Sequence, residues 1–151
     1  MPDAEAPSPT PSNATVVDAT GLVLGRAASH IAKRLLNGEA IVVVNAEKSV
    51  VTGSRRTVLA HYVAARARGS KRTGPHYPRN PDRIFRRTVR GMLPHLKTRG
   101  REAFGQLEVH IGVPDALKGA PTQTIETARA RPALRPPMTL AEITRLLGAR
   151  V

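Results

Sequence analysis

The hydrophobic positions between residues 15 and 44 follow two different periods, and they predict a strand, a helix and a second strand. Thr15-Val16-Val17 is a short β-branched stretch that ends at Asp18. From Leu24 to Leu36, apolar residues recur at i, i+3, i+4 and i+7, the spacing of one helix face. The continuous apolar run Ala40–Val44 is typical of a strand that is covered on both faces of a parallel sheet. This order is a βαβ unit, for which a right-handed crossover is expected.

A second helix is predicted directly after a short extended piece at residues 49–52. Ser54 is a suitable N-cap, because its hydroxyl oxygen accepts a hydrogen bond from a free N–H group of the first helical turn. The chain then enters a loop that contains glycines and prolines, from Arg66 to Pro81. The apolar side of the helix is expected to hold Val58, Leu59, Tyr62 and Val63.

The C-terminal half of the chain carries fewer periodic segments. Asp82 opens a helix after Pro81, and Pro94 closes it. Residues 107–111 alternate between apolar and polar, which predicts a strand with one exposed face. Beyond Gly112 the chain is rich in proline until the Thr-Leu-Ala-Glu stretch at residues 139–142, a capping box that starts a short terminal helix.

These elements predict a single α/β domain with two flanking segments. At about 100–200 residues per domain, a chain of 151 residues holds one domain. Residues 1–14 form an acidic, Pro-rich tail that buries too little apolar surface to offset its ordering entropy, so we expect it to be disordered. Residues 15–113 form the α/β domain, and residues 114–151 form a Pro-rich extension that ends in the short helix.

Positive charge is concentrated in one part of the chain. The formal net charge is +13, and residues 66–101 hold 12 of the 24 basic side chains with a single acid, Asp82. Such an excess indicates a polyanionic partner, either nucleic acid or an anionic membrane surface. The longest apolar run is far shorter than the roughly 20 residues that span a bilayer, and the N-terminus lacks a secretory signal. The sequence therefore predicts a soluble intracellular protein.

The predicted helix at residues 82–93 separates apolar from basic positions. Like charges three and four residues apart repel by about 0.2–0.5 kcal/mol per pair, and only Asp82 offsets them. Phosphates between the guanidinium groups would remove this repulsion, because arginine binds phosphate through two parallel hydrogen bonds. A solvated basic face is the alternative. The basic stripe consists of Arg83, Arg86, Arg87 and Arg90. The packing face consists of Ile84, Phe85, Thr88, Val89, Met92 and Leu93.

Several chemistries find no support in the sequence. The chain has no cysteine, which excludes disulfides, Cys-ligated zinc and thiol catalysis. Its five histidines lack metal-ligand spacing, and neither a nucleophile elbow nor a pair of catalytic carboxylates accompanies them. Four aromatic residues are too few for a module that stacks successive bases of a single strand. We therefore expect no catalytic residue, no cofactor and no metal.

The glycines at residues 21 and 25 lie between the first strand and the first helix, where nucleotide-binding proteins carry a glycine-rich loop. Here no third glycine and no Gly-Lys-Ser/Thr sequence follows. We interpret Gly21 and Gly25 as a tight turn with close helix–sheet packing, and a nucleotide site as the lesser alternative. Asp18, at the end of the first strand, fits a turn or capping role better than that of a catalytic acid.

Several stretches together resemble one known family, the thirteenth universal ribosomal protein of the large subunit. The resemblance covers roughly Thr15 to Pro114, and its most specific part is Arg-Thr-Val-Arg-Gly-Met-Leu-Pro at residues 87–94. The short connection between the first helix and the second strand, and residues 74–85, resemble the archaeal and eukaryotic branch. The other matching stretches are Val16–Gly21, Leu24–Arg26, Val44–Lys48, Val51–Gly53, Gly100 and Leu107–Val109.

The resemblance implies a three-layer α/β/α sandwich around a small, mainly parallel sheet. It also implies a non-catalytic protein of cytoplasmic ribosomes that binds and stabilises large-subunit rRNA beside neighbouring ribosomal proteins. By this resemblance Arg86, Arg87 and Arg90 contact phosphates, while Met92 and Leu93 pack into the core. A DNA-binding basic protein and, less favoured, a nucleotide-dependent α/β enzyme are the alternatives.

The predicted rRNA-binding residues share a positive charge, and most of them lie in the basic segment at residues 66–101. Glycines in the loop let a nucleic-acid strand approach the backbone closely, whereas a merely flexible basic linker is the alternative. The predicted residues are Arg26, Lys33, Arg34, Arg55, Arg56, Arg66, Arg68, Lys71, Arg72, Arg79, Arg83, Arg86, Arg87, Arg90, Lys97, Arg99 and Arg101.

Overall fold

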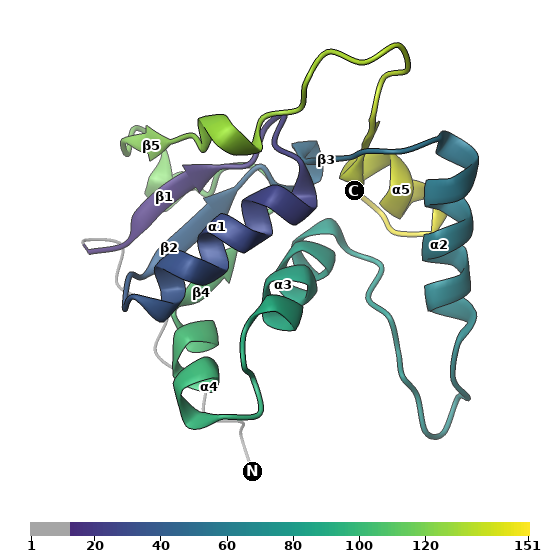
Figure 1. Cartoon of the computed structure of the whole chain (residues 1–151), viewed down its shortest axis with the longest axis horizontal. Helices are drawn as coiled ribbons and strands as arrows, with labels where there is room; N and C mark the ends of the chain where they lie inside the picture. Colours follow the sequence, from purple (N-terminus) through teal and green to yellow (C-terminus); the bar gives the residue numbers. More distant parts are fainter. Residues whose placement is uncertain (1–12) are drawn as a thin grey trace.

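The N-terminal part of the fold is the predicted βαβ unit (Figure 1). The computed structural model describes residues 13–151, so nearly all of the tail predicted at residues 1–14 lies outside it. Strand β1 (Thr15–Asp18) is followed by helix α1 (Leu24–Leu36) and strand β2 (Ile41–Val44). The two strands are parallel and in register from the pair Thr15 and Ile41 to the pair Asp18 and Val44.

The main sheet is parallel throughout and has the order β4-β2-β1-β5 in the described part of the chain. Strand β4 (Leu107–Val109) lies beside β2, and β5 (Thr122–Gln123) lies beside β1. All four residues of β2 are buried, as the continuous apolar run predicts for a central strand. The predicted α/β class with a mainly parallel sheet is confirmed.

The two faces of the sheet are covered to different depths. On one face, Val17, Ile41 and Val43 pack in a core that also contains α1 and α3 (Pro81–Met92). On the other face, Val16, Val42 and Val44 pack against Leu117 of the short 3-10 helix η2 (Asp115–Leu117). The third layer of the predicted sandwich is therefore a thin covering of irregular chain, whereas the helical layer holds most of the core (Figure 1).

A second, two-stranded sheet joins the end of the chain to its middle. Strand β3 (Val50–Val51) follows the 3-10 helix η1 (Ala46–Lys48) and pairs antiparallel with β6 (Met138–Thr139). Helix α5 (Leu140–Leu146) begins where predicted, because the Thr139 hydroxyl accepts a hydrogen bond of 3.3 Å from the Glu142 N–H group. The remaining 3-10 helix is η3 (Glu126–Ala128).

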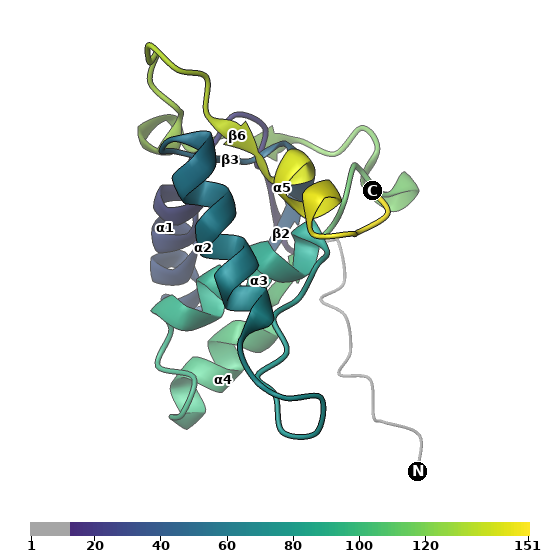
Figure 2. The ribbon, with the colours of Figure 1, turned by 90° about the vertical axis from the view of Figure 1, so that its right-hand side faces the viewer.

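Helix α2 (Arg55–Ala67) lies toward the outside of the molecule, in front of α1 and α3 in Figure 2. Its predicted N-cap is confirmed, since Ser54 Oγ accepts a hydrogen bond of 3.2 Å from the Thr57 N–H group. Val58 and Tyr62 are buried, but Val63 is 54% exposed, so its predicted packing is wrong. A peripheral helix touches the core along a narrow strip, and Val63 lies outside that strip.

Helix α4 (Thr98–Gly105) has no counterpart among the predicted elements, because two glycines and several polar residues obscure any apolar period. Gly100 is buried in it and approaches the Pro94 backbone so closely that a Cβ atom would lie 2.1 Å from the Pro94 carbonyl oxygen. Only glycine fits at this crossing. No helix within residues 13–151 is long and apolar enough to cross a membrane.

We expect Gly100→Ala to destabilise the protein by about 1–3 kcal/mol, because the added methyl group overpacks the contact with Pro94. Gly105→Ala, on the same helix with nothing within 4 Å of its Cβ position, is the matched control and should change stability by less than about 1 kcal/mol. Urea unfolding of both variants measures the difference. Equal stability of the two variants would show that the close approach is absent.

Candidate nucleic-acid interface

Helix α3 separates its apolar and basic side chains as the sequence predicts. Ile84, Phe85 and Val89 are completely buried, whereas the four stripe arginines are on the outer side and at least partly exposed. The predicted packing of Met92 is wrong: it is 44% exposed, while Leu93 is buried. Met92 lies on the apolar side of the helix, but it is the last helical residue, and the chain turns back toward the core only at Leu93.

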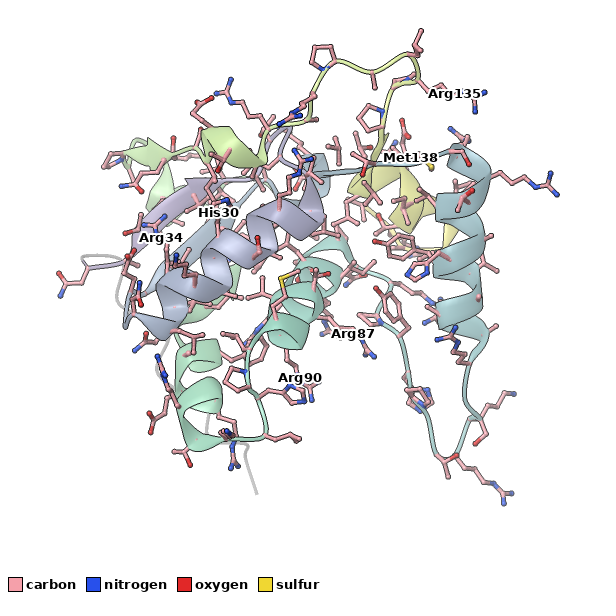
Figure 3. The ribbon with its side chains drawn as sticks, viewed as in Figure 1. His30, Arg34, Arg87, Arg90, Arg135 and Met138 are labelled. Carbon is pink, nitrogen blue, oxygen red and sulfur yellow. The ribbon has the colours of Figure 1, made fainter. Side chains whose placement is uncertain are left out.

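The four arginines of α3 line one open hollow of about 540 Å³. Figure 3 shows Arg87 and Arg90 extending from α3 on the side away from α1 and the sheet. Two residues from other parts of the chain complete the lining, Pro78 before the helix and Phe104 in α4. Four arginines of one helix therefore line a single shallow depression, which we call the arginine surface (Arg83, Arg86, Arg87, Arg90).

Aromatic rings, rather than carboxylates, support this surface. The Arg86 guanidinium carbon lies 4.7 Å from the centre of the Phe104 ring, and that of Arg87 lies 4.9 Å from the centre of the Tyr77 ring. Each such contact contributes about 0.5–1 kcal/mol at an exposed site. The ion pairs found within residues 13–151 involve none of the four arginines. These contacts with ring faces involve no carboxylate, so the N–H groups stay available for an anion.

The basic loop between α2 and α3 is braced at its ends and presents its charges outward. Arg66 donates a hydrogen bond of 2.7 Å to the Tyr77 carbonyl oxygen, which ties the start of the loop to its end. At the tip, Ser70 Oγ accepts a hydrogen bond of 3.1 Å from the Thr73 N–H group. The loop extends away from the sheet in Figure 1. Its exposed cations are Arg68, Lys71, Arg72 and Arg79.

Two further predicted residues are engaged within the protein. Arg34 forms an ion pair of 2.7 Å with Glu39 and donates a hydrogen bond of 3.3 Å to Gln123 of β5. Arg99 of α4 donates a hydrogen bond of 3.4 Å to the Leu36 carbonyl oxygen at the end of α1. Figure 3 shows Arg34 on α1, far from the α3 arginines. These contacts give both side chains a bracing role between elements.

The remaining predicted residues lie outside the arginine surface. Arg26 and Lys33 are exposed on α1. Lys97 directly precedes α4 and Arg101 lies within it, and both are exposed. Arg55 and Arg56 line a separate hollow of about 580 Å³ at the start of α2. Arg135 lines the same hollow, and sequence reasoning missed it because only the fold brings residues 135 and 55 together.

The carboxyl ends of β1 and β2 are held by a closed hydrogen-bond network. Asp18 Oδ1 accepts hydrogen bonds from the Thr20 N–H group (3.0 Å), the Thr20 hydroxyl (2.7 Å) and the Asn45 amide (3.1 Å). Partial burial opposes the charge of Asp18, but these hydrogen bonds and the nearby Lys48 outweigh it and lower the pKa of the carboxyl group. The turn role predicted for Asp18 is confirmed.

The glycine pair between β1 and α1 is only partly explained by the fold. Gly21 has a φ of +71°, a turn conformation that glycine adopts freely, as predicted. The predicted close packing at Gly25 is wrong, because nothing lies within 4 Å of its Cβ position. The fold itself therefore does not require glycine at residue 25.

Three of the histidines interact with protein neighbours. His30 Nε2 lies 3.0 Å from the Thr127 hydroxyl, and His110 Nε2 lies 2.8 Å from a Glu108 carboxylate oxygen. His61 meets the Tyr62 ring edge-on, with ring centres 5.4 Å apart. No group of three or more His, Cys, Asp or Glu side chains suited to a metal ion occurs in the described part of the chain.

The fold and the arginine surface together define a class: a small α/β protein with a nearly neutral scaffold and one cationic loop–helix face. The chain belongs to the ribosomal protein L13 family, whose family model, "Ribosomal protein L13", matches residues 12–116. The expected family is thus confirmed, over almost the same residues that carry the resemblance in the sequence.

Curated relatives extend this match over most of the chain. The large ribosomal subunit protein uL13 of Archaeoglobus fulgidus is 53% identical over 138 residues, which cover 90% of this chain and 88% of the relative. The protein of the same name from Methanosarcina barkeri is 54% identical over 118 residues, or 78% of this chain and 84% of the relative. The protein of the same name from Methanococcoides burtonii is 43% identical over 137 residues, which cover 90% of this chain and 99% of the relative. These archaeal relatives agree with the predicted branch.

The two tyrosines of the protein should ionise at unusually high pH. Burial, together with the neighbouring Tyr77, raises the pKa of Tyr62 from 10.0 to about 12, and burial also raises the pKa of Tyr77, although Arg87 opposes this. A raised folded-state pKa stabilises the fold below the unfolded value of about 10, and this contribution is lost as the pH rises through 12.

Tyrosinate absorbance measured against pH, with Tyr62→Phe as the control, should show the ionisation step of Tyr62 near pH 12 in the parent alone. Ionisation of both tyrosines near pH 10 in the folded protein would contradict the burial.

Proposed function

We propose that this protein is a structural constituent of the large ribosomal subunit that binds and stabilises large-subunit rRNA. The observation that carries the proposal is the arginine surface, four guanidinium groups around one hollow without a carboxylate partner among the described residues. Relatives named large ribosomal subunit protein uL13 support the same role. The protein acts in the cytoplasm as part of the ribosome, beside neighbouring ribosomal proteins.

The chemistry of the surface favours contact with the RNA backbone. Arginine forks match phosphate oxygens, and the basic loop offers further cations at residues 68–79. A-form RNA hides its base edges in a deep, narrow major groove, so proteins recognise it mainly through shape, phosphates and 2′-hydroxyls. We assign the phosphate contacts to the arginine surface, the loop cations, Lys97 and Arg101. We assign weaker phosphate contacts to four cations that lie outside the arginine surface: Arg26, Lys33, Arg55 and Arg56.

The two alternative functions fit the geometry less well. A DNA-reading helix needs a free face that offers several kinds of hydrogen-bonding side chain to base edges, whereas α3 is buried along one side and presents arginine on the other. A nucleotide-dependent enzyme of this topology would bind its ligand at the carboxyl ends of the strands. There Asp18 is engaged by Thr20 and Asn45 and presents a carboxylate rather than anion-binding N–H groups, and we propose that the protein has no catalytic activity.

Replacing Arg83, Arg86, Arg87 and Arg90 by Gln should make rRNA binding less sensitive to salt. Each phosphate contact contributes about 0.7–0.9 to the slope of log affinity against log salt, so the loss of four contacts lowers the slope by about 3 units. The measurement is a filter-binding titration of the full chain with large-subunit rRNA at several salt concentrations.

The matched control removes four arginines outside the proposed site, Arg129, Arg131, Arg145 and Arg150, again as Gln. It changes the net charge equally but should leave the slope nearly unchanged. If both quadruple variants lower the slope by the same amount, the binding follows net charge and the arginine surface has no special role.

A further inference from the structure

A third hollow, of about 340 Å³, lies between the start of α1, strand β3 and helix α2. Its volume is near the lower end of the range of small-molecule pockets, about 300–1,000 Å³. The lining residues are Val23, Leu24, Gly25, Val50, Val51, Thr52, His61, Tyr62, Tyr77 and Thr88, none of them acidic.

Aromatic rings form one wall of this hollow. The ring centres of Tyr62 and Tyr77 are 6.1 Å apart with their planes inclined by 65°, and His61 lies edge-on to Tyr62. The only two tyrosines in the chain therefore meet at this place, together with a histidine. Tyr62 is buried, so the half-buried Tyr77 and the exposed His61 are the rings that an unpaired base can contact here.

Gly25 supplies an independent observation. It is the second residue of α1, and no protein atom lies within 4 Å of its Cβ position to require a glycine there. Gly25 lines the hollow, so the missing side chain keeps the space beside Leu24 and Val51 open. A residue that the fold does not need, at the border of an aromatic hollow, indicates the close approach of another molecule.

The lining of the hollow and that of the arginine surface adjoin each other along the chain. Tyr77 lines the hollow and Pro78, the next residue, lines the arginine surface; in the same way Thr88 follows Arg87. The Arg87 guanidinium lies over the Tyr77 ring, so a cation stands between the two depressions. A ligand that spans both depressions needs an anionic backbone and a flat, largely apolar head group. A nucleotide of an RNA strand has both.

We propose that the hollow, which we call the tyrosine pocket, receives one unpaired base of the RNA whose phosphates lie on the arginine surface. This inference rests on the proposed function and deepens it. The base inserts beside Tyr62, Tyr77 and Gly25, and Arg87 neutralises the adjoining phosphate. The protein thereby recognises a bulged or looped nucleotide next to a helix, which a purely electrostatic surface does not distinguish from regular duplex.

The test fills the pocket without touching a charge. Gly25→Leu places a side chain at the pocket border, at a helical position that has free space and no strained backbone, so the variant should fold at least as stably as the parent. Ser29→Leu is the matched control, an exposed position one turn further along α1 and outside the pocket lining. Each full-length variant is titrated with large-subunit rRNA by filter binding, and its melting temperature is measured alongside.

We expect Gly25→Leu to lose roughly 5- to 100-fold in affinity, the range for one base stacked on aromatic side chains, while Ser29→Leu binds like the parent. The salt slope of Gly25→Leu should stay at the parent value, because no phosphate contact is removed. Tyr77→Leu serves as a second variant: it removes a ring of the pocket and also the ring beneath Arg87, so it should weaken binding at least as much as Gly25→Leu.

Equal affinities of Gly25→Leu, Tyr77→Leu and the parent would overturn the tyrosine pocket. The proposal of a base-binding site is also overturned if Gly25→Leu binds free rRNA normally but fails to join assembled subunits. In that case the occupant of the pocket is a neighbouring protein. Neither result touches the proposed function, which fails separately if the parent itself does not bind rRNA. Weakened binding with an unchanged salt slope supports the pocket.

Discussion

The burial of one side of α3 is the constraint on which the rest of the molecule depends. Ile84, Phe85 and Val89 are completely enclosed in the core that α1 and the sheet share with this helix, and each contributes about 1.5–3 kcal/mol through apolar burial. The helix cannot rotate about its axis without exposing them. The arginines on its opposite side therefore point outward in a fixed arrangement, and the packing of the core sets the geometry of the proposed RNA surface.

The same burial explains how the protein tolerates four neighbouring arginines that form no ion pair within the described residues. Repulsion costs a few tenths of a kcal/mol for each neighbouring pair, which is far less than the burial of the apolar side stabilises. Tyr77 and Phe104 hold two guanidinium groups in place through their ring faces. The arginine surface is thus preorganised, but the repulsion between its positive charges remains. A bound phosphate would reduce this repulsion and so stabilise the protein. In the proposed function, RNA phosphates neutralise this uncompensated charge on a rigid support.

The sequence predicts the elements whose signal is local and leaves out those that depend on distant partners. The βαβ unit, the caps at Ser54 and Thr139 and the two sides of α3 follow from periodicity and short-range hydrogen bonding. Strands β5 and β6 have two residues each and exist only through pairing with β1 and β3. Met92 has the right angular position but lies beyond the end of the core. The aromatic side chains that support the arginine surface, Tyr77 and Phe104, also escape prediction, because no local sequence pattern connects them to α3.

A place in the large ribosomal subunit, held through the loop–helix face, can be tested on the native protein. The experiment is sedimentation of a lysate from the source organism through a sucrose gradient, with antibody detection of this chain. The protein should migrate with the large subunit and be released from it only at high salt. Recovery of the protein solely in the soluble fractions at the top of the gradient would contradict a structural role in the subunit.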